Sequence, residues 1–253
     1  MALITTPAVV LSSLRYGETS KIVRLATRDH GVQSAIAKGA LRPRSRFGAA
    51  LQLLSVGVAH LIAKEGRELH LLTAFDVIRV PIALAGDLER YAAAGAMAET
   101  MLRFAPPDPH PDSYDAFTTA LAELEAAPAP DAAAAGLRGL WRVVASLGFA
   151  PVLDVCARDG AALSPAGPIA FSARDGGALC PACAAHAEAT RLPADARAAL
   201  EALAQIDVPL PVLDSRHAAA HRRLLARFIR SHLGEGTDLP ALEFWERRAW
   251  AAA

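Results

Sequence analysis

The chain has 253 residues and is 53% hydrophobic, which is enough for two or three compact units with packed cores. Its 26 basic and 26 acidic residues balance, and three widely spaced cysteines do not form the disulfide framework of a small secreted protein. The sequence shows no cleavable signal and no apolar run long enough to span a bilayer, so we expect a protein of the reducing cytoplasm without a membrane partner.

The charge balance hides a division near residue 80. Residues 1–80 contain eleven Lys or Arg and five Asp or Glu, whereas the remainder contains 15 and 21. We therefore expect a basic domain at 1–80 and an acidic, mostly helical domain at 81–253. A basic half favours a polyanionic ligand, because each phosphate contact releases counterions.

Alternation of apolar and polar residues in the first domain predicts five β-strands, at 7–15, 19–28, 31–38, 51–64 and 67–75. Five strands in a domain of this size match an OB-fold, a barrel that commonly binds single-stranded nucleic acid. An SH3-like barrel fits the periodicity almost as well. The predicted fold class is therefore α+β, with an N-terminal five-stranded OB-fold barrel followed by helices.

The segment AKGALRPRSRF, residues 37–47, places four cations in a loop between the third and fourth predicted strands. Gly39, Pro43 and Gly48, which follows the segment, keep it out of the sheet and present the cations to solvent. Nearby cations of the second strand and two aromatic residues that can stack on bases extend the candidate surface. The predicted DNA-binding residues are Lys38, Arg42, Arg44, Arg46, Arg24, Arg28, Lys21, Tyr16 and Phe47. In the alternative interpretation the cations are only solvated, and Tyr16 and Phe47 fill the barrel.

Helical periodicity predicts helices at 87–105, 112–127, 132–148 and 214–234 in the second domain. Arg138 and Arg142 are four residues apart, as on a solvated helix face. The last helix begins at Asp214, a residue suited to an N-cap, and has four arginines opposite its apolar stripe. These arginines indicate either a second DNA-contacting surface or a solvated face with internal ion pairs; they are Arg216, Arg223, Arg227 and Arg230.

All three cysteines lie in a predicted zinc-finger-like insertion at about 152–190. Cys180 and Cys183 form a C-x2-C pair, whereas Cys156 is followed three residues later by Asp159. Three interpretations stay open: Asp159 completes a structural zinc site, His186 does so instead, or the metal has been lost. We expect no catalytic role for such a metal, because no general base lies nearby in the sequence.

Motifs of phosphate-loop, dinucleotide, zinc-protease and serine-hydrolase sites are absent, so we expect a protein that is not an enzyme. Two other classes stay open. One is a zinc-ribbon scaffold that binds RNA or ribosomes, and the other is a metal-dependent nuclease that uses the cysteines.

Three segments carry a resemblance to a known family: VVLSSLRYGETSKIVRLATRDHGVQSAIAKGALRPRSRFGAALQ at 9–52, Leu-Gly-Phe-x-Pro at 147–151, and RRLLARFIRSHLG at 222–234. Together they resemble RecO, the bacterial recombination mediator. The resemblance implies an OB-fold, a helical C-terminal domain and strand annealing without ATP. It also implies action on single-stranded and double-stranded DNA at the nucleoid.

The resemblance further implies three protein partners: single-stranded DNA-binding protein, RecR and, indirectly, RecA. The acidic, apolar tail of the single-stranded DNA-binding protein is the expected ligand of a basic, apolar pocket in the helical domain, for which Arg138 and Arg142 are candidates. Family members often have four cysteines in the insertion, so Asp159 departs from the family pattern at the expected fourth zinc ligand.

Overall fold

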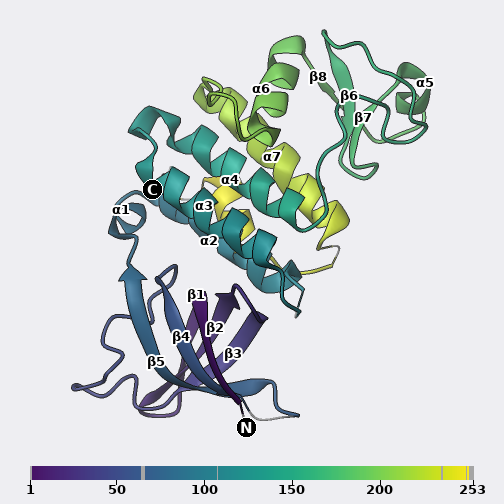
Figure 1. Cartoon of the computed structure of the whole chain (residues 1–253). Coiled ribbons are helices and arrows are strands. Elements are labelled where there is room, and N and C mark those ends of the chain that lie inside the picture. The colour runs from purple at the N-terminus through teal and green to yellow at the C-terminus, as the bar shows by residue number, and fades with distance from the viewer. Residues whose placement is uncertain (1, 64–65, 107, 235, 249, 251–253) are drawn as a thin grey trace. The chain divides into compact units, whose positions relative to one another are not determined.

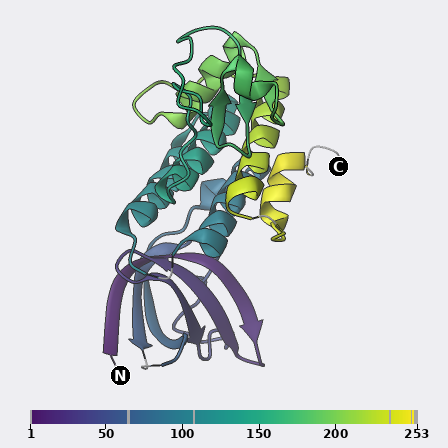
Figure 2. The same ribbon diagram turned by 90° about the vertical axis from the view of Figure 1, so that its right-hand side faces the viewer.

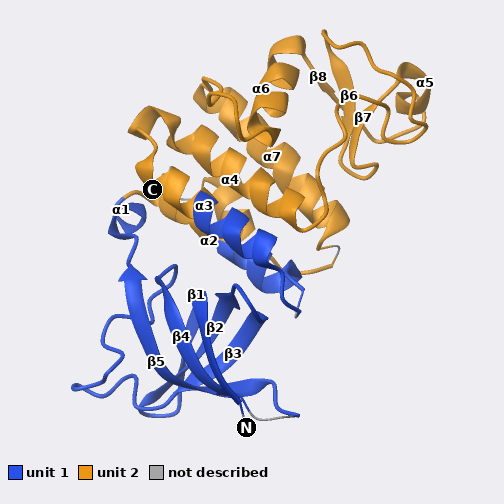
Figure 3. Cartoon of the chain, viewed as in Figure 1, with its two compact units in different colours: residues 1–86, 98–119 blue, residues 87–97, 120–253 orange. Residues whose placement is uncertain are grey.

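The computed structural model describes residues 2–63, 66–106, 108–234, 236–248 and 250. Its contacts group the chain into two compact units (Figure 3). One unit combines residues 1–86 with 98–119, and the other combines 87–97 with 120–253. The expected boundary near residue 80 stays a prediction, since the first unit also includes part of the helical sequence.

A closed barrel of five strands forms the first unit's sheet, with the order β1-β2-β3-β5-β4. Its strands curve around a common axis in Figure 2, and their bounds are β1 Ala2–Tyr16, β2 Ser20–Thr27, β3 Gly31–Ala37, β4 Val56–Ala63 and β5 Leu69–Arg79. Strand β1 pairs with β4 through its first half and with β2 through its second half. A register shift between Val10 and Ser12 lets β1 bend from one neighbour to the other. Parallel pairing of β3 with β5 completes the barrel, and the five-stranded OB-type prediction is confirmed.

Alternate side chains of these strands point into the barrel, as the pleat of a β-strand requires. The barrel core is made of small and branched side chains from all five strands, including Val10, Leu25, Ala35, Leu61 and Leu72. Gly57 lets β4 approach β5 closely, because a Cβ atom there would collide with the Asp76 carbonyl and the Phe75 ring.

The predicted strand at 51–64 is too long at its start, because β4 begins only at Val56. Leu51 and Leu54 are buried, but they reach the interior from turns rather than from a strand. Leu54 has a positive φ of 67°, and its N–H donates to the Val10 carbonyl at 2.8 Å. Residue 64, the last of the predicted run, lies outside the described residues.

The helices of the chain are α1 Ile82–Ala85, α2 Leu88–Phe104, α3 Pro111–Ala126, α4 Ala132–Ser146, α5 Pro181–Ala184, α6 Ala194–Ala204, α7 Ser215–His232 and α8 Pro240–Arg247, with a 3-10 turn η1 at Ala129–Asp131 (Figure 1). The four predicted long helices are thus confirmed as α2, α3, α4 and α7. Asp214 is the N-cap of α7, as predicted, and its side chain accepts the His217 N–H at 2.8 Å.

Within the second unit, α4 packs against α6 and α7, and α7 packs against α8. Trp141 of α4 meets Phe228 of α7 edge-on, with ring centroids 5.0 Å apart. Gly136 and Gly139 of α4 leave room for Ala93, Met97 and Ala120, which a Cβ atom would crowd. Small residues therefore let these helices pack closely, so much of this alanine-rich core is filled without large side chains.

A buried ion pair lies in the same unit. Arg222 of α7 is 1% exposed and pairs with Glu89 of α2, and its guanidinium lies over the Trp245 ring of α8, 5.8 Å from the centroid. Burial lowers the pKa of Arg222, and the Glu89 carboxylate opposes this shift. Arg248 Nε also lies 3.4 Å from Glu89 Oε2. Glu89 is therefore a carboxylate shared by two cations from the C-terminal part of the chain.

Candidate nucleic-acid interface and cysteine cluster

The loop between β3 and β4, residues 38–55, is a succession of tight turns. Backbone N–H groups of Arg42, Ser45, Gly48 and Ala50 each donate to the carbonyl three residues earlier, at 2.8 to 3.2 Å. Gly39 has a positive φ of 72°, a conformation that favours glycine. The loop backbone is therefore held in a defined conformation by its own hydrogen bonds.

Apolar residues of this loop hold it to the barrel while its cations point outward. Ala40, Phe47 and Leu51 belong to the barrel core. The four predicted cations of the loop are all exposed: Lys38, Arg42, Arg44 and Arg46. The loop thus presents a cluster of positive charge on an anchored backbone.

The predicted stacking of Phe47 on bases is wrong, because this ring is 3% exposed and fills the barrel. Arg46 lies over the same ring, with its guanidinium carbon 5.2 Å from the centroid. Phe47 therefore stabilises a loop cation through a cation–π contact. Tyr16 differs, since it is exposed at the end of β1. Stacking on Tyr16 stays a prediction.

The predicted cations near β2 fall into two environments. Lys21 and Arg24 are half-buried on the strand. Arg28, just beyond the strand, donates twice to Asp115 of α3 in the same unit, at 3.0 and 2.8 Å. This hydrogen bond lowers the pKa of Asp115. A phosphate would have to compete with a carboxylate for Arg28, so this residue is a weaker candidate than the loop cations.

The predicted partner-binding role of Arg138 and Arg142 is wrong, because both residues are only 8% exposed. Arg138 donates to the carbonyls of Ala202 and Pro209 at 3.0 and 2.9 Å. Arg142 pairs with Glu123, with Nη2 3.0 Å from Oε1. Both guanidinium groups therefore join helices inside the second unit.

Three of the four arginines of α7 lie on its solvent-exposed side, which both alternatives allow. Arg216, Arg223 and Arg227 are exposed on the side opposite the buried apolar residues. Arg230 instead pairs with Glu246 of α8 at 2.6 Å, as the alternative of internal ion pairing foresaw.

The cysteine insertion contains a three-stranded sheet of order β7-β6-β8, with bounds β6 Ile169–Ser172, β7 Gly177–Leu179 and β8 Thr190–Leu192. Cys180 follows β7 and caps helix α5, since its Sγ accepts the Cys183 N–H at 3.4 Å. On the opposite turn, Asp159 Oδ1 accepts the Ala161 N–H at 3.0 Å. Two tight turns therefore face each other, each presenting the predicted metal-ligating residues.

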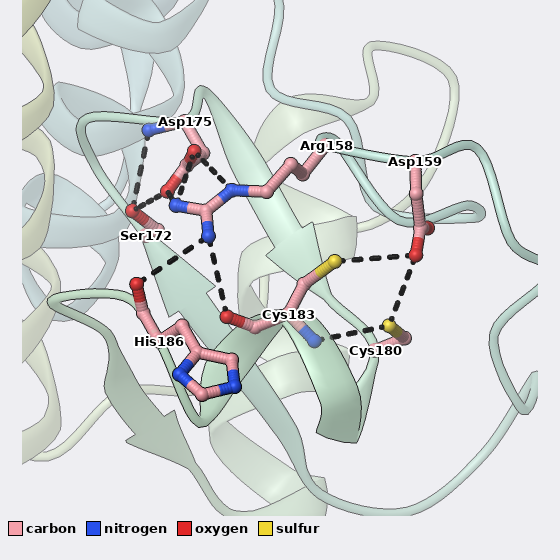
Figure 4. A network of polar contacts seen from close by, with 7 residues as sticks. All are labelled: Arg158, Asp159, Ser172, Asp175, Cys180, Cys183 and His186. Carbon is pink, nitrogen blue, oxygen red and sulfur yellow. Dashed lines mark hydrogen bonds and ion pairs between the residues drawn. The ribbon is translucent and has the colours of Figure 1, made fainter.

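The structure brings all four of these residues together: the ligand atoms of Cys156, Asp159, Cys180 and Cys183 lie within 4.8 Å of one another. Asp159 Oδ2 is 3.4 Å from Cys180 Sγ and 3.2 Å from Cys183 Sγ (Figure 4). Tetrahedral zinc with ordinary Zn–S and Zn–O bonds would separate such atoms by roughly 3.5 Å. The residues present therefore fit a zinc-type ion, with Asp159 in the fourth position.

Ionisation within the cluster follows its hydrogen bonds. The Ala161 N–H, with the Cys156 and Cys183 thiols, lowers the pKa of Asp159. The same carboxylate raises the pKa of Cys183 to about 12, chiefly through the hydrogen bond that the thiol donates to it. A bound cation would replace these thiol protons, because thiolates are the metal-ligating form.

An ion pair that the sequence interpretation missed braces the two turns. Arg158 donates to both carboxylate oxygens of Asp175 and to the carbonyls of Cys183 and His186 (Figure 4). The His186 ring points away from the sulfur atoms in this view, so the alternative in which it supplies the fourth ligand is not supported. A signal was available: Ala-Arg-Asp-Gly occurs at both 157–160 and 173–176, with Arg158 from the first copy and Asp175 from the second.

Among the described residues, no helix combines the length and apolar character needed to cross a membrane. Family models for the N-terminal and C-terminal parts of recombination protein O match residues 1–81 and 85–240. A DNA repair protein RecO of Anaeromyxobacter dehalogenans is 36% identical over 235 residues, which span 89% of this chain and 90% of that protein. Another, of Rubrobacter xylanophilus, is 36% identical over 63% of each chain. The chain therefore belongs to the RecO family of recombination proteins, which supports a role in DNA repair and recombination.

Proposed function

We propose that this protein binds DNA through the β3–β4 loop and anneals complementary strands without ATP. The observation that carries this proposal is the set of four exposed cations on a loop whose apolar residues are fixed in the barrel core. An anchored loop backbone loses little conformational freedom when its cations meet a phosphate backbone. Counterion release then supplies binding that depends little on base sequence.

Strand annealing requires neutralisation of the phosphate charges but no covalent reaction. Two complementary strands repel each other through their phosphates, and cations that bind both strands lower this barrier. Base pairing itself supplies the free energy of the product. The proposed mechanism therefore assigns no catalytic residue and no nucleotide cofactor.

We further propose that the strands are coated with single-stranded DNA-binding protein and that the protein works with RecR to load RecA. Its substrates would include single-stranded and double-stranded DNA at the nucleoid. The relatives' membership of a DNA repair family supports this proposal. The buried Arg138 and Arg142 no longer offer a surface for these partners.

An annealing assay tests the central proposal. Two complementary oligonucleotides, each coated with the cognate single-stranded DNA-binding protein, are mixed with and without this protein and with and without ATP. We expect faster duplex formation with the protein and equal rates in the two ATP conditions. Pairing at the uncatalysed rate would contradict annealing, and competition by structured RNA but not by DNA would favour an RNA-binding scaffold.

We propose that Cys156, Asp159, Cys180 and Cys183 hold one structural zinc ion. The separations between the Asp159 oxygen and two sulfur atoms support this proposal. When bound, zinc would stabilise the two facing turns as a cross-link.

Replacing Cys180 and Cys183 together by serine should lower the thermal midpoint more than it lowers DNA affinity, measured where the variant is folded. Elemental analysis should give about one zinc per wild-type chain and less in Asp159→Ala. His186→Ala is the matched control, because its ring lies outside the cluster, and it should keep the wild-type metal content. A metal-free wild type of normal stability would contradict the zinc proposal.

A further inference from the structure

A cavity of about 370 Å³ lies within the second unit, between β8, α6 and α7. Its lining includes the apolar residues Leu192, Pro193, Ala196 and Leu224. Small-molecule sites in proteins have volumes of roughly 300 to 1,000 Å³, so this cavity suits a ligand about the size of one nucleotide.

His221 of α7 lines this cavity and is 3% exposed. Neither of its ring nitrogens has a hydrogen-bond partner in the part of the chain that the structure describes. Burial lowers the pKa of His221 to about 4, helped by the nearby His217 and opposed by Asp195. A neutral imidazole offers one donor and one acceptor, and buried polar groups of this kind normally have partners. Both nitrogens are also shielded from solvent, so a ligand in the cavity would meet the carbon atoms of the ring rather than its polar atoms.

Cations surround this apolar cavity. Arg191, Arg216, Arg223 and Arg227 all contribute to its lining. On α7 the last three are seven and four residues apart, so they lie on one face at spacings of roughly 10 and 6 Å along the axis. Among the described residues, Arg216 and Arg223 form no ion pair, and Arg227 donates only a long hydrogen bond of 3.4 Å to the Thr190 hydroxyl.

The row of cations continues beyond the cavity. Arg223 and Arg227 also line a neighbouring cavity of about 750 Å³, together with Arg174 and Arg230. The nearby acids are fewer: Asp195 and Asp214 lie close to His217, and Glu188 and Glu246 line the larger cavity. A chain of repeated negative charges complements this row better than a ligand with a single charged end.

We propose that this cavity receives one unpaired base of a nucleic-acid strand, whose phosphates bind Arg216, Arg223 and Arg227. The base would lie against the apolar lining and against the His221 ring. A base in a duplex is paired and stacked and would first have to leave the helix, so the cavity would select single strands. This inference rests on the proposed DNA-binding function and adds a second site, in a different unit from the β3–β4 loop.

The test compares a short single-stranded oligonucleotide with an abasic oligonucleotide of equal length, which keeps every phosphate but lacks the bases. Ala220→Trp places a bulky ring at an exposed position that lines the cavity. It should weaken binding of the normal oligonucleotide by about tenfold, the magnitude expected for one stacked base, and leave the abasic one nearly unchanged. Ala198→Trp, exposed on α6, is the matched control and should change neither affinity.

His221→Ala gives an independent second variant, because it removes the ring against which the base would lie. It should reduce the preference for the normal oligonucleotide over the abasic one. Equal effects of Ala220→Trp on the two oligonucleotides would overturn the inference. A variant that loses binding of an acidic peptide but keeps wild-type DNA binding would overturn it as well. Wild-type protein that binds no DNA would instead contradict the proposed function itself.

Discussion

Replacing Arg42, Arg44 and Arg46 together by alanine is expected to reduce the salt dependence of single-stranded DNA binding by up to about 2 in the slope of log affinity against log salt. Each lost phosphate contact removes about 0.7 of that slope on a single strand. Binding should weaken to a similar extent on unrelated base sequences, because phosphate contacts do not read sequence.

Single, double and triple variants make the expected result stepwise. Affinities are measured by fluorescence anisotropy over a range of salt concentrations. The double variant Arg103→Ala with Arg247→Ala removes as much charge as a double loop variant from exposed positions outside the loop, and it should retain the wild-type slope. Thermal midpoints should hardly change, since exposed charges contribute little to stability.

A folded triple variant with the wild-type salt slope would show that these arginines do not contact DNA. The exposed arginines of α7 would then become the principal candidates for phosphate binding. A slope that falls equally in the Arg103 and Arg247 control would indicate a general charge effect rather than a site.

Glu89→Ala should lower the free energy of unfolding of the second unit by about 3 to 5 kcal/mol. The change removes the carboxylate beside Arg222, and a guanidinium that is 1% exposed would remain without its counter-charge. All three tryptophans of the chain belong to this unit, so urea unfolding followed by intrinsic fluorescence reports on it directly.

Two comparisons make this prediction sharper. Glu243→Ala breaks the exposed pair of Glu243 with Arg247, which are 2.7 Å apart on α8, and it should cost less than about 1 kcal/mol. Combining Glu89→Gln with Arg222→Met removes both charges and should restore much of the stability lost in Glu89→Ala, because an apolar side chain replaces a buried charge. Equal losses for Glu89→Ala and Glu243→Ala would show that burial of Arg222 does not govern the energetics of this pair.

The sequence predicted the barrel well because its strands alternate with the period of a pleated sheet. It did not show that Tyr16 is exposed and Phe47 is buried, because each of these aromatic residues directly follows an arginine near a turn. Only the three-dimensional path of the β3–β4 loop directs Phe47 inward and Tyr16 outward. Nor did the apolar run before Val56 reveal that its leucines enter the core from turns.

The arginines of α4 show a different limit. Spacing by four residues suggested a solvated face, but nearly every residue from Ala132 to Val144 is buried. The composition around them carried the better signal: alanine, glycine and large apolar residues leave no polar face apart from Arg138 and Arg142 themselves. A helix that is apolar all round is typically buried, and its cations then require internal acceptors.

The cysteine cluster was predictable from spacing because turns of the C-x2-C kind place their first and last residues side by side. That argument made Asp159 one candidate for the fourth position. It could not distinguish Asp159 from His186, since the choice depends on where the exposed His186 ring points. The Arg158–Asp175 brace depends likewise on how the two copies of Ala-Arg-Asp-Gly meet in space.

The interleaved composition of the two units has a consequence for synthesis on the ribosome. The first unit takes residues from both sides of 87–97, so it cannot gain its last native contacts until residue 119 has been translated and has left the exit tunnel. The hydrogen bond from Arg28 to Asp115, for example, can form only after Asp115 has been translated. A nascent chain that stalls just after the barrel strands would therefore lack residues 98–119 of its unit. A fragment that ends near residue 86 would lack the same residues.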